Sequence, residues 1–130
     1  MRVHLRSLCI ALALAAGFPR AQAELIDIAW DAQGRFDKVS TVPPGKFVEV
    51  CGKLARGVTI EWVFDADLPG DFNIHYHVGK EVAFPARQSA VAHGTGTLEV
   101  KSEQDYCWMW TNKSDSAARL ELRLNRSTQR

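Results

Sequence analysis

The sequence predicts an all-β protein, and more narrowly a single-domain antiparallel β-sandwich. After residue 23, no stretch repeats apolar residues at i, i+3, i+4 and i+7 for three turns, whereas several segments alternate with period two. These segments are short, recur roughly every 8–12 residues and are separated by Gly- and Pro-containing turns, which is typical of a sandwich or a small barrel. We therefore expect two packed sheets, with a small β-barrel as the alternative.

The elements expected in the first half of the domain are four strands. Residues 25–30 form the first and end at a turn over 31–34, and residues 36–42 form the second, which Pro43-Pro44-Gly45 stops. Residues 46–51 and 58–64 follow, joined through Gly52 and Gly57. In the last of these, Val58, Ile60, Trp62 and Phe64 share one face, which is the pattern of one buried and one solvated side.

The second half of the domain is expected to begin with a turn over 67–71. Strands follow over 72–77 and 81–84, joined by a turn over 78–80 and ended by Pro85. Residues 86–96 are small and polar and are expected to be a loop. Alternation predicts the last strands over 97–100, 106–111 and 118–124.

The first 23 residues predict a signal peptide. Arg2 and Arg6 precede an apolar stretch over 8–16, and Ala21-Gln22-Ala23 has the small-x-small form after which signal peptidase cuts. An apolar run of about 10 residues is too short for a bilayer that needs roughly 20. We expect cleavage after Ala23, a mature domain over 24–130 with no membrane span, and a periplasmic or secreted location.

The charge of the mature domain argues against a nucleic-acid partner. Removal of residues 1–23 takes away three arginines and no acidic residue, so 13 Lys and Arg face 15 Asp and Glu, and the net charge is −2 rather than +1. The partner to expect is a metal ion or another protein of the cell envelope.

Two cysteines remain after processing, Cys51 and Cys107. An even count in an oxidising compartment predicts one disulfide, although thiolate metal ligands or a redox pair are alternatives. A cross-link over 56 residues is expected to add about 4 kcal/mol of stability in the chain-entropy model.

The histidines offer a candidate metal site. His75 and His77 flank one residue of a predicted strand, so their side chains project from the same face with Cα atoms about 7 Å apart. His93 lies in the Gly-flanked loop, and Met109 is the only methionine left after processing. A thioether beside two imidazoles favours copper, whereas a third imidazole or a carboxylate favours zinc. The alternative is a pair of ordinary surface histidines, and the sequence leaves open whether Met109 shares their face.

An aromatic string over 106–110 offers a second candidate site. Alternation places Tyr106, Trp108 and Trp110 on one face of the strand and Cys107 and Met109 on the other. The aromatic face either packs in the core or forms a surface patch that binds a partner. Tryptophan could also cap a Cu(I) ion by a cation–π contact.

The stretch from Cys51 to Leu124 resembles the GOLD domain, the disulfide-linked β-sandwich of Golgi cargo-receptor proteins. The residues that match are Cys51, Gly57, Tyr106, Trp108, Trp110 and Asn112. The late cysteine departs from the pattern, because Met109 stands at the family's cysteine position and Cys107 lies two residues earlier. The resemblance implies a sandwich, a disulfide and a protein-interaction role, with no catalytic residues.

A second resemblance is to the first metal motif of the cupins. His75, His77 and Glu81 match its H-x-H and Glu spacing, and His93 would supply the ligand of the second motif. Gln88 stands where the closing Gly of the motif belongs. The resemblance implies a metalloenzyme in which these side chains meet inside a barrel.

Other catalytic patterns are missing, since no nucleophile elbow or Gly-rich phosphate loop is present. The sequence therefore favours an exported binding module for copper, and less strongly zinc, that uses His75 and His77 with His93 or Met109. The alternatives are a metal-free GOLD-like interaction domain that uses the aromatic patch and a cupin-like metalloenzyme.

Overall fold

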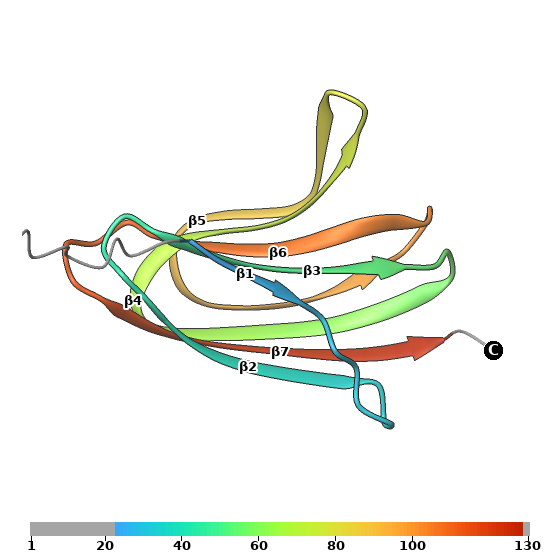
Figure 1. Cartoon of the computed structure of the whole chain (residues 1–130), viewed down its shortest axis with the longest axis horizontal. Helices are drawn as coiled ribbons and strands as arrows, with labels where there is room; N and C mark the ends of the chain where they lie inside the picture. The colour runs from blue at the N-terminus through green and yellow to red at the C-terminus, as the bar shows by residue number, and fades with distance from the viewer. Residues whose placement is uncertain (1–22, 129–130) are drawn as a thin grey trace, which may run out of the picture.

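The computed structural model describes residues 23–128, in which the chain forms seven β-strands (Figure 1). The strands are β1 (Glu24–Asp27), β2 (Arg35–Val42), β3 (Phe47–Leu54), β4 (Val58–Val78), β5 (Glu81–Glu99), β6 (Gln104–Asn112) and β7 (Ala118–Thr128). This part of the chain contains no helix able to cross a membrane. The predicted signal peptide lies almost wholly outside the described residues, so its cleavage stays a prediction.

Strand β4 bends and takes part in two layers. Its first half, Val58–Ala66, pairs with β7, and β7 pairs with β2. Its second half, from Gly70 to His75, pairs with β6, which pairs with β3 and then β1. We call the first layer (β2, β7, the first half of β4 and residues 93–99 of β5, which pair with it) sheet I, and the second (β1, β3, β6 and the second half of β4) sheet II. The predicted all-β sandwich is therefore confirmed.

The two sheets nearly close into a barrel at their far edges. Strand β1 lies parallel to β3, which departs from the expected antiparallel arrangement, and it ends at Asp27 rather than at residue 30. The Lys38 ammonium of β2 lies 3.0 Å from the Glu24 carboxylate of β1, so an ion pair joins the outer strands of the two sheets.

The core lies between the sheets and is rich in aromatic side chains. Trp62 and Phe64 project inward from sheet I and meet Phe72 of sheet II, with ring centroids 4.8 and 4.5 Å apart. The predicted inward face of residues 58–64 is confirmed, because its four apolar side chains are all buried.

The aromatic face of β6 is also part of the core. Tyr106, Trp108 and Trp110 are only 3, 1 and 2 % exposed, so the interpretation of these residues as a surface patch is wrong. Strand β6 lies in the middle of sheet II between β3 and β4, and its bulky face packs against sheet I. Cys107 and Met109 point to the outer surface instead. The predicted disulfide between Cys51 and Cys107 is confirmed, and it joins directly opposed residues of β3 and β6.

Strands β4 and β5 form one long bent hairpin, where we expected a turn over 67–71 and a loop over 86–96. The first segment is a bend inside β4, at a shift in the register with β5. The second is an edge strand whose glycines let core aromatic rings lie across it. A Cβ atom on Gly94 would come 2.3 Å from the Phe64 ring, and one on Gly96 would come 2.5 Å from the Trp62 ring. Small residues that indicate a loop are therefore required here by packing.

Candidate protein-interaction surface

The end of the β4–β5 hairpin projects beyond the sandwich. Pairing between β4 and β6 stops where His75 lies opposite Cys107. From that point to the turn, the two strands pair only with each other, from Tyr76 opposite Ala83 to Val78 opposite Glu81. Figure 1 shows this hairpin, drawn in olive and yellow, standing away from both layers. It is an exposed element that a partner could reach from several sides.

The projecting hairpin carries most of the large exposed apolar side chains of the described chain. Three of the five in residues 23–128 lie here, namely Val78, Val82 and Phe84, while the other two are Leu25 and Val39. The Arg87 guanidinium covers the Phe84 ring at 3.9 Å from its centroid. We call His77, Val82, Phe84 and Arg87 the hairpin face. Aromatic and Arg side chains are the types enriched at protein interfaces.

The root of the hairpin, which comprises His75 and Tyr76, makes side-chain contacts on both faces of the strand. On the outer side, His75 is only 6 % exposed, and its Nε2 atom lies 3.0 Å from the Glu49 carboxylate. Its Nδ1 atom lies 2.8 Å from the side-chain amide oxygen of Asn73. On the inner side, the Tyr76 ring packs against Tyr106 with centroids 4.9 Å apart. These contacts fix the direction in which the hairpin projects, which reduces the ordering cost of binding.

The environment of His75 favours its neutral form. Burial lowers the pKa of His75, and the nearby His77 lowers it further, while the charge and hydrogen bond of Glu49 raise it. The net direction is downward because burial is the largest effect. His75 therefore serves as a buried hydrogen-bonding group between β4 and β3.

The four residues of the predicted cupin motif do not meet at one point. Glu81 lies opposite Val78, whereas His77 lies opposite Val82, so Glu81 and His77 project from opposite faces of the hairpin. His93 lies opposite Asp65 in the first half of β4, and its Nδ1 atom contacts the Asp65 carboxylate at 2.7 Å. It belongs to the outer surface of sheet I, away from His75 on sheet II. The cupin-like arrangement is therefore wrong.

The question that the sequence left open about Met109 is answered by the strand register. Met109 lies opposite both Asn73 and Glu49, so it shares the outer face of sheet II with His75. The rings of His75 and His77 are 5.4 Å apart at their centroids. Sharing a face does not by itself provide a ligand set, because Nε2 of His75 already lies against the Glu49 carboxylate and Nδ1 against the Asn73 side chain.

The described residues do not supply a convincing metal-binding cluster. Between residues 23 and 128, the only group of three His, Cys, Asp or Glu ligand atoms within 4.8 Å of one another comprises Glu49, Cys51 and Cys107. Both cysteines are joined in the disulfide and offer no thiolate. A metal-binding role is not supported by this donor set.

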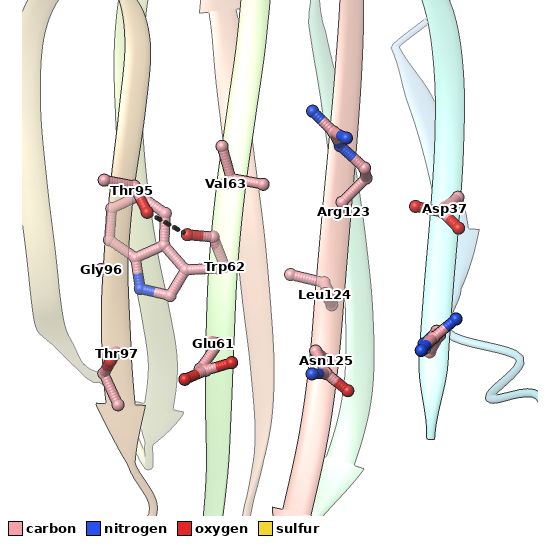
Figure 2. Close-up of a pocket in the computed structure, with 11 residues that line it drawn as sticks. Asp37, Glu61, Trp62, Val63, Thr95, Gly96, Thr97, Arg123, Leu124 and Asn125 are labelled. Carbon is pink, nitrogen blue, oxygen red and sulfur yellow. Dashed lines mark hydrogen bonds between the residues drawn. The ribbon is translucent and has the colours of Figure 1, made fainter. Parts of the chain in front are cut away.

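A second candidate surface, which is concave, lies on the outer face of sheet I. It is a groove of about 560 Å³ across β5, β4, β7 and β2, as Figure 2 shows. The groove is lined by Arg35, Asp37, Glu61, Trp62, Val63, Thr95, Gly96, Thr97, Arg123, Leu124 and Asn125. Most of its side chains are polar and exposed, and Arg123 already contacts Asp65 at 3.5 Å. The groove lacks an exposed aromatic anchor, so we regard the hairpin face as the stronger candidate.

Apart from His77, which was predicted as a metal ligand, the residues of the hairpin face carry no signal in the sequence that marks them as a surface site. Phe84 and Val82 fit a strand of alternating residues, and alternation predicts that one side of such a strand is buried. The missing information is that neither sheet extends as far as the hairpin tip. Only the three-dimensional pairing shows that these apolar side chains have no layer to cover them.

Comparisons with known proteins identify the fold but no family. No protein-family model matches the chain, and no curated protein sequence matches it either. Among solved structures, the fold resembles PliG of Aeromonas hydrophila, a periplasmic inhibitor of g-type lysozyme, with a TM-score of 0.63 and 9 % identity over 82 % of this chain and 98 % of that one. It also resembles PliG of Salmonella Typhimurium, with a TM-score of 0.58 and 9 % identity over 81 % of this chain and 100 % of that one.

A third structural neighbour has a different role. The pre-peptidase C-terminal domain of the Bacillus anthracis collagenase matches with a TM-score of 0.57 and 12 % identity, over 80 % of this chain and 95 % of that one. At these identities the likeness defines the fold alone. The disulfide and the periplasmic neighbours agree with the predicted periplasmic or secreted location.

Proposed function

We propose that this chain is an envelope protein that acts by binding another protein, with the hairpin face as its anchor. The observation that supports this most directly is the exposed Phe84 and Val82 on a hairpin that projects beyond both sheets. A solvated sandwich has no structural need for apolar side chains there. The contacts of His75 with Glu49 and of Tyr76 with Tyr106 keep the hairpin face in one orientation.

The partner class we propose is a peptidoglycan-cleaving enzyme of the lysozyme type. Two of the structural neighbours are described as lysozyme inhibitors, and the likeness extends over nearly their whole chains. The chemistry of the hairpin is compatible with such a target. Glycoside hydrolases keep a pair of carboxylates in an open cleft, and the hairpin presents Arg87 over the Phe84 ring and carries Lys80 in its turn.

The test is an inhibition assay with the exported protein and a g-type lysozyme. We expect the rate of peptidoglycan lysis to fall as the protein is added, and calorimetry to give a saturable complex. The double variant Val82→Asp/Phe84→Asp should lose both effects. Val39→Asp is the matched control, because Val39 is a 50 % exposed apolar residue on the outer face of sheet I. Unchanged lysis and no complex with the wild-type protein would show that the partner class is wrong.

A GOLD-like role belongs to the same broad class, since it is also the binding of another protein. The shared features are the sandwich and the disulfide, and the family itself is not matched. A GOLD-like role would have to use a surface other than Tyr106, Trp108 and Trp110, which are buried.

Copper or zinc binding at His75 and His77 stays a prediction, with less support than protein binding. Metal analysis of protein purified from its native compartment would test it. Stoichiometric copper in the wild-type protein that disappears in His75→Ala/His77→Ala would establish the metal site, whereas metal-free protein with no affinity for either ion would exclude it.

A further inference from the structure

The outer edge of β5 consists of two stretches with different properties. Within residues 23–128, β5 pairs only with β4, so no strand of this part of the chain lies along its outer edge. Residues 81–91 are irregular, because they contain Pro85, two shifts in register with β4, and Ala90 at a φ of 54°. Residues 93–99 pair with β4 without interruption and contain no proline and no lysine. This second stretch thus lacks the proline, the lysine and the irregular pairing by which many proteins protect an edge strand.

The backbone groups that face outward from this stretch can be assigned from its end. The Val100 N–H donates to the carbonyl of Val58, and the Val100 carbonyl accepts from the Gly57 N–H, so Val100 faces β4. Backbone groups along a strand alternate in direction. The residues that present free N–H and carbonyl groups to solvent are therefore His93, Thr95, Thr97 and Glu99.

We propose that two copies of this chain pair through residues 93–99, as antiparallel strands related by a twofold axis at Gly96. In this register Thr95 of one copy lies opposite Thr97 of the other, and the outward backbone groups of the two strands match. His93 of one copy then lies opposite Glu99 of the other, and the twofold axis repeats this pair. Sheet I of each copy continues into that of its partner, which is the usual geometry of β-augmentation.

Charge complementarity selects this register from its neighbours. Moving the axis to Thr95 places His93 opposite Thr97 and Glu99 opposite Val91, so no charged pair forms. Moving it to Thr97 places His93 opposite Lys101, which is unfavourable when the histidine is charged. Of these three registers, only the one with its axis at Gly96 places the His93 imidazole opposite the Glu99 carboxylate. Opposite charges across strands stabilise pairing.

The second copy is a better occupant of this edge than a strand from an unrelated protein. The stretch is complementary to itself in backbone direction, in its threonines and in its charges. The outer edges of β1 and β2 are less open to a partner, because the Lys38–Glu24 ion pair joins these two strands. This proposal is independent of the lysozyme partner, because residues 93–99 are not part of the hairpin face.

The experiment is sedimentation of the exported protein over a concentration series up to roughly 1 mM, the weak end of specific association. A single pair of strands is a small interface, so we expect a reversible monomer–dimer equilibrium. Thr97→Pro removes an outward N–H, which an edge strand tolerates, and this variant should stay monomeric with an unchanged circular dichroism spectrum. Wild-type protein that remains monomeric throughout would overturn the proposal.

Charge variants test the register without a risk of unfolding by proline. His93→Glu and Glu99→Lys should each weaken the dimer by roughly threefold to thirtyfold, because each change affects both symmetry-related pairs. The double variant His93→Glu/Glu99→Lys should recover the dimer, since the introduced carboxylate of one copy would then face the introduced ammonium of the other. Single and double variants that all dimerise like the wild type would assign the contact to another surface and refute the proposal.

Discussion

The two halves of the β4–β5 hairpin differ in what surrounds them. In the half next to β7, seven residue pairs from Thr59 opposite Glu99 to Asp65 opposite His93 follow without a shift. Trp62 in this half is 5 % exposed. In the half that leads to the tip, the register shifts repeatedly, and Phe84 is 41 % exposed. The same pair of strands thus provides a piece of the core at one end and exposed apolar side chains at the other.

The comparison shows that burial depends on a facing layer more than on the residues of the strand. Trp62 and Phe84 are both aromatic residues of alternating strands. Trp62 meets Phe72 of the opposite sheet, whereas Phe84 packs beside the His75 ring and under the Arg87 guanidinium, close to where pairing between β4 and β6 stops.

Trp62→Ala should destabilise the fold by about 5 kcal/mol, the upper end for truncation of a buried aromatic residue. Its ring packs on Phe64 and Phe72 and lies across Gly96, where no Cβ atom can fill the space. Urea unfolding followed by far-ultraviolet circular dichroism measures the loss. A cost below about 1 kcal/mol would mean that this half of the hairpin is not part of the core.

The double variant Cys51→Ala/Cys107→Ala should lose about 4 kcal/mol of stability, because the bond closes a 56-residue separation between β3 and β6. Cys107 lies opposite His75, so the loss falls on the sheet that supports the hairpin root. Urea midpoints of oxidised wild type and of the double variant give the difference. Equal midpoints would show that strand pairing alone holds β3 to β6.

Stability should fall as the solution is acidified below about pH 6.5, the ordinary pKa of histidine. Burial lowers the pKa of His75 in the folded protein, so the unfolded chain binds a proton more readily. The contribution is therefore complete above the unfolded pKa and is lost as the pH falls through the folded one. Unfolding free energies between pH 7.5 and 5 measure it, and His75→Gln should show a smaller dependence. An identical slope in that variant would assign the effect to other groups.

Local patterns in the sequence predict much of this fold. The inward face of residues 58–64 follows from alternation alone, and the disulfide follows from the cysteine count and the predicted export. The pairing of β1 in parallel with β3 has no local signal, because it depends on how distant segments meet. The loop expected over 86–96 is a strand for a similar reason, since its glycines accommodate the rings of Trp62 and Phe64 from another strand.

The candidate site was harder to predict than the fold. Alternation separates Trp108 and Trp110 from Cys107 and Met109, but it does not say which set faces the other sheet. That choice is made by the central position of β6 in sheet II. The spacing of His75 and His77 correctly places both on one face, yet it does not indicate that Glu49, from a strand far away in the sequence, lies against the His75 ring. The exposed hairpin depends on where β4 stops pairing with β6, which no residue near Phe84 indicates.

Phe84→Ala should have the smallest effect on stability and a large effect on binding. The ring is 41 % exposed and does not belong to the core cluster, so its truncation should cost less than about 1 kcal/mol. If the hairpin face anchors a lysozyme, the same change should weaken the complex at least tenfold, about 1.4 kcal/mol of binding free energy. Unfolding by urea and titration against the lysozyme measure the two quantities on the same preparation. The opposite result, a large loss of stability with binding unchanged, would mean that the tip belongs to the core and that the two halves of the hairpin are alike.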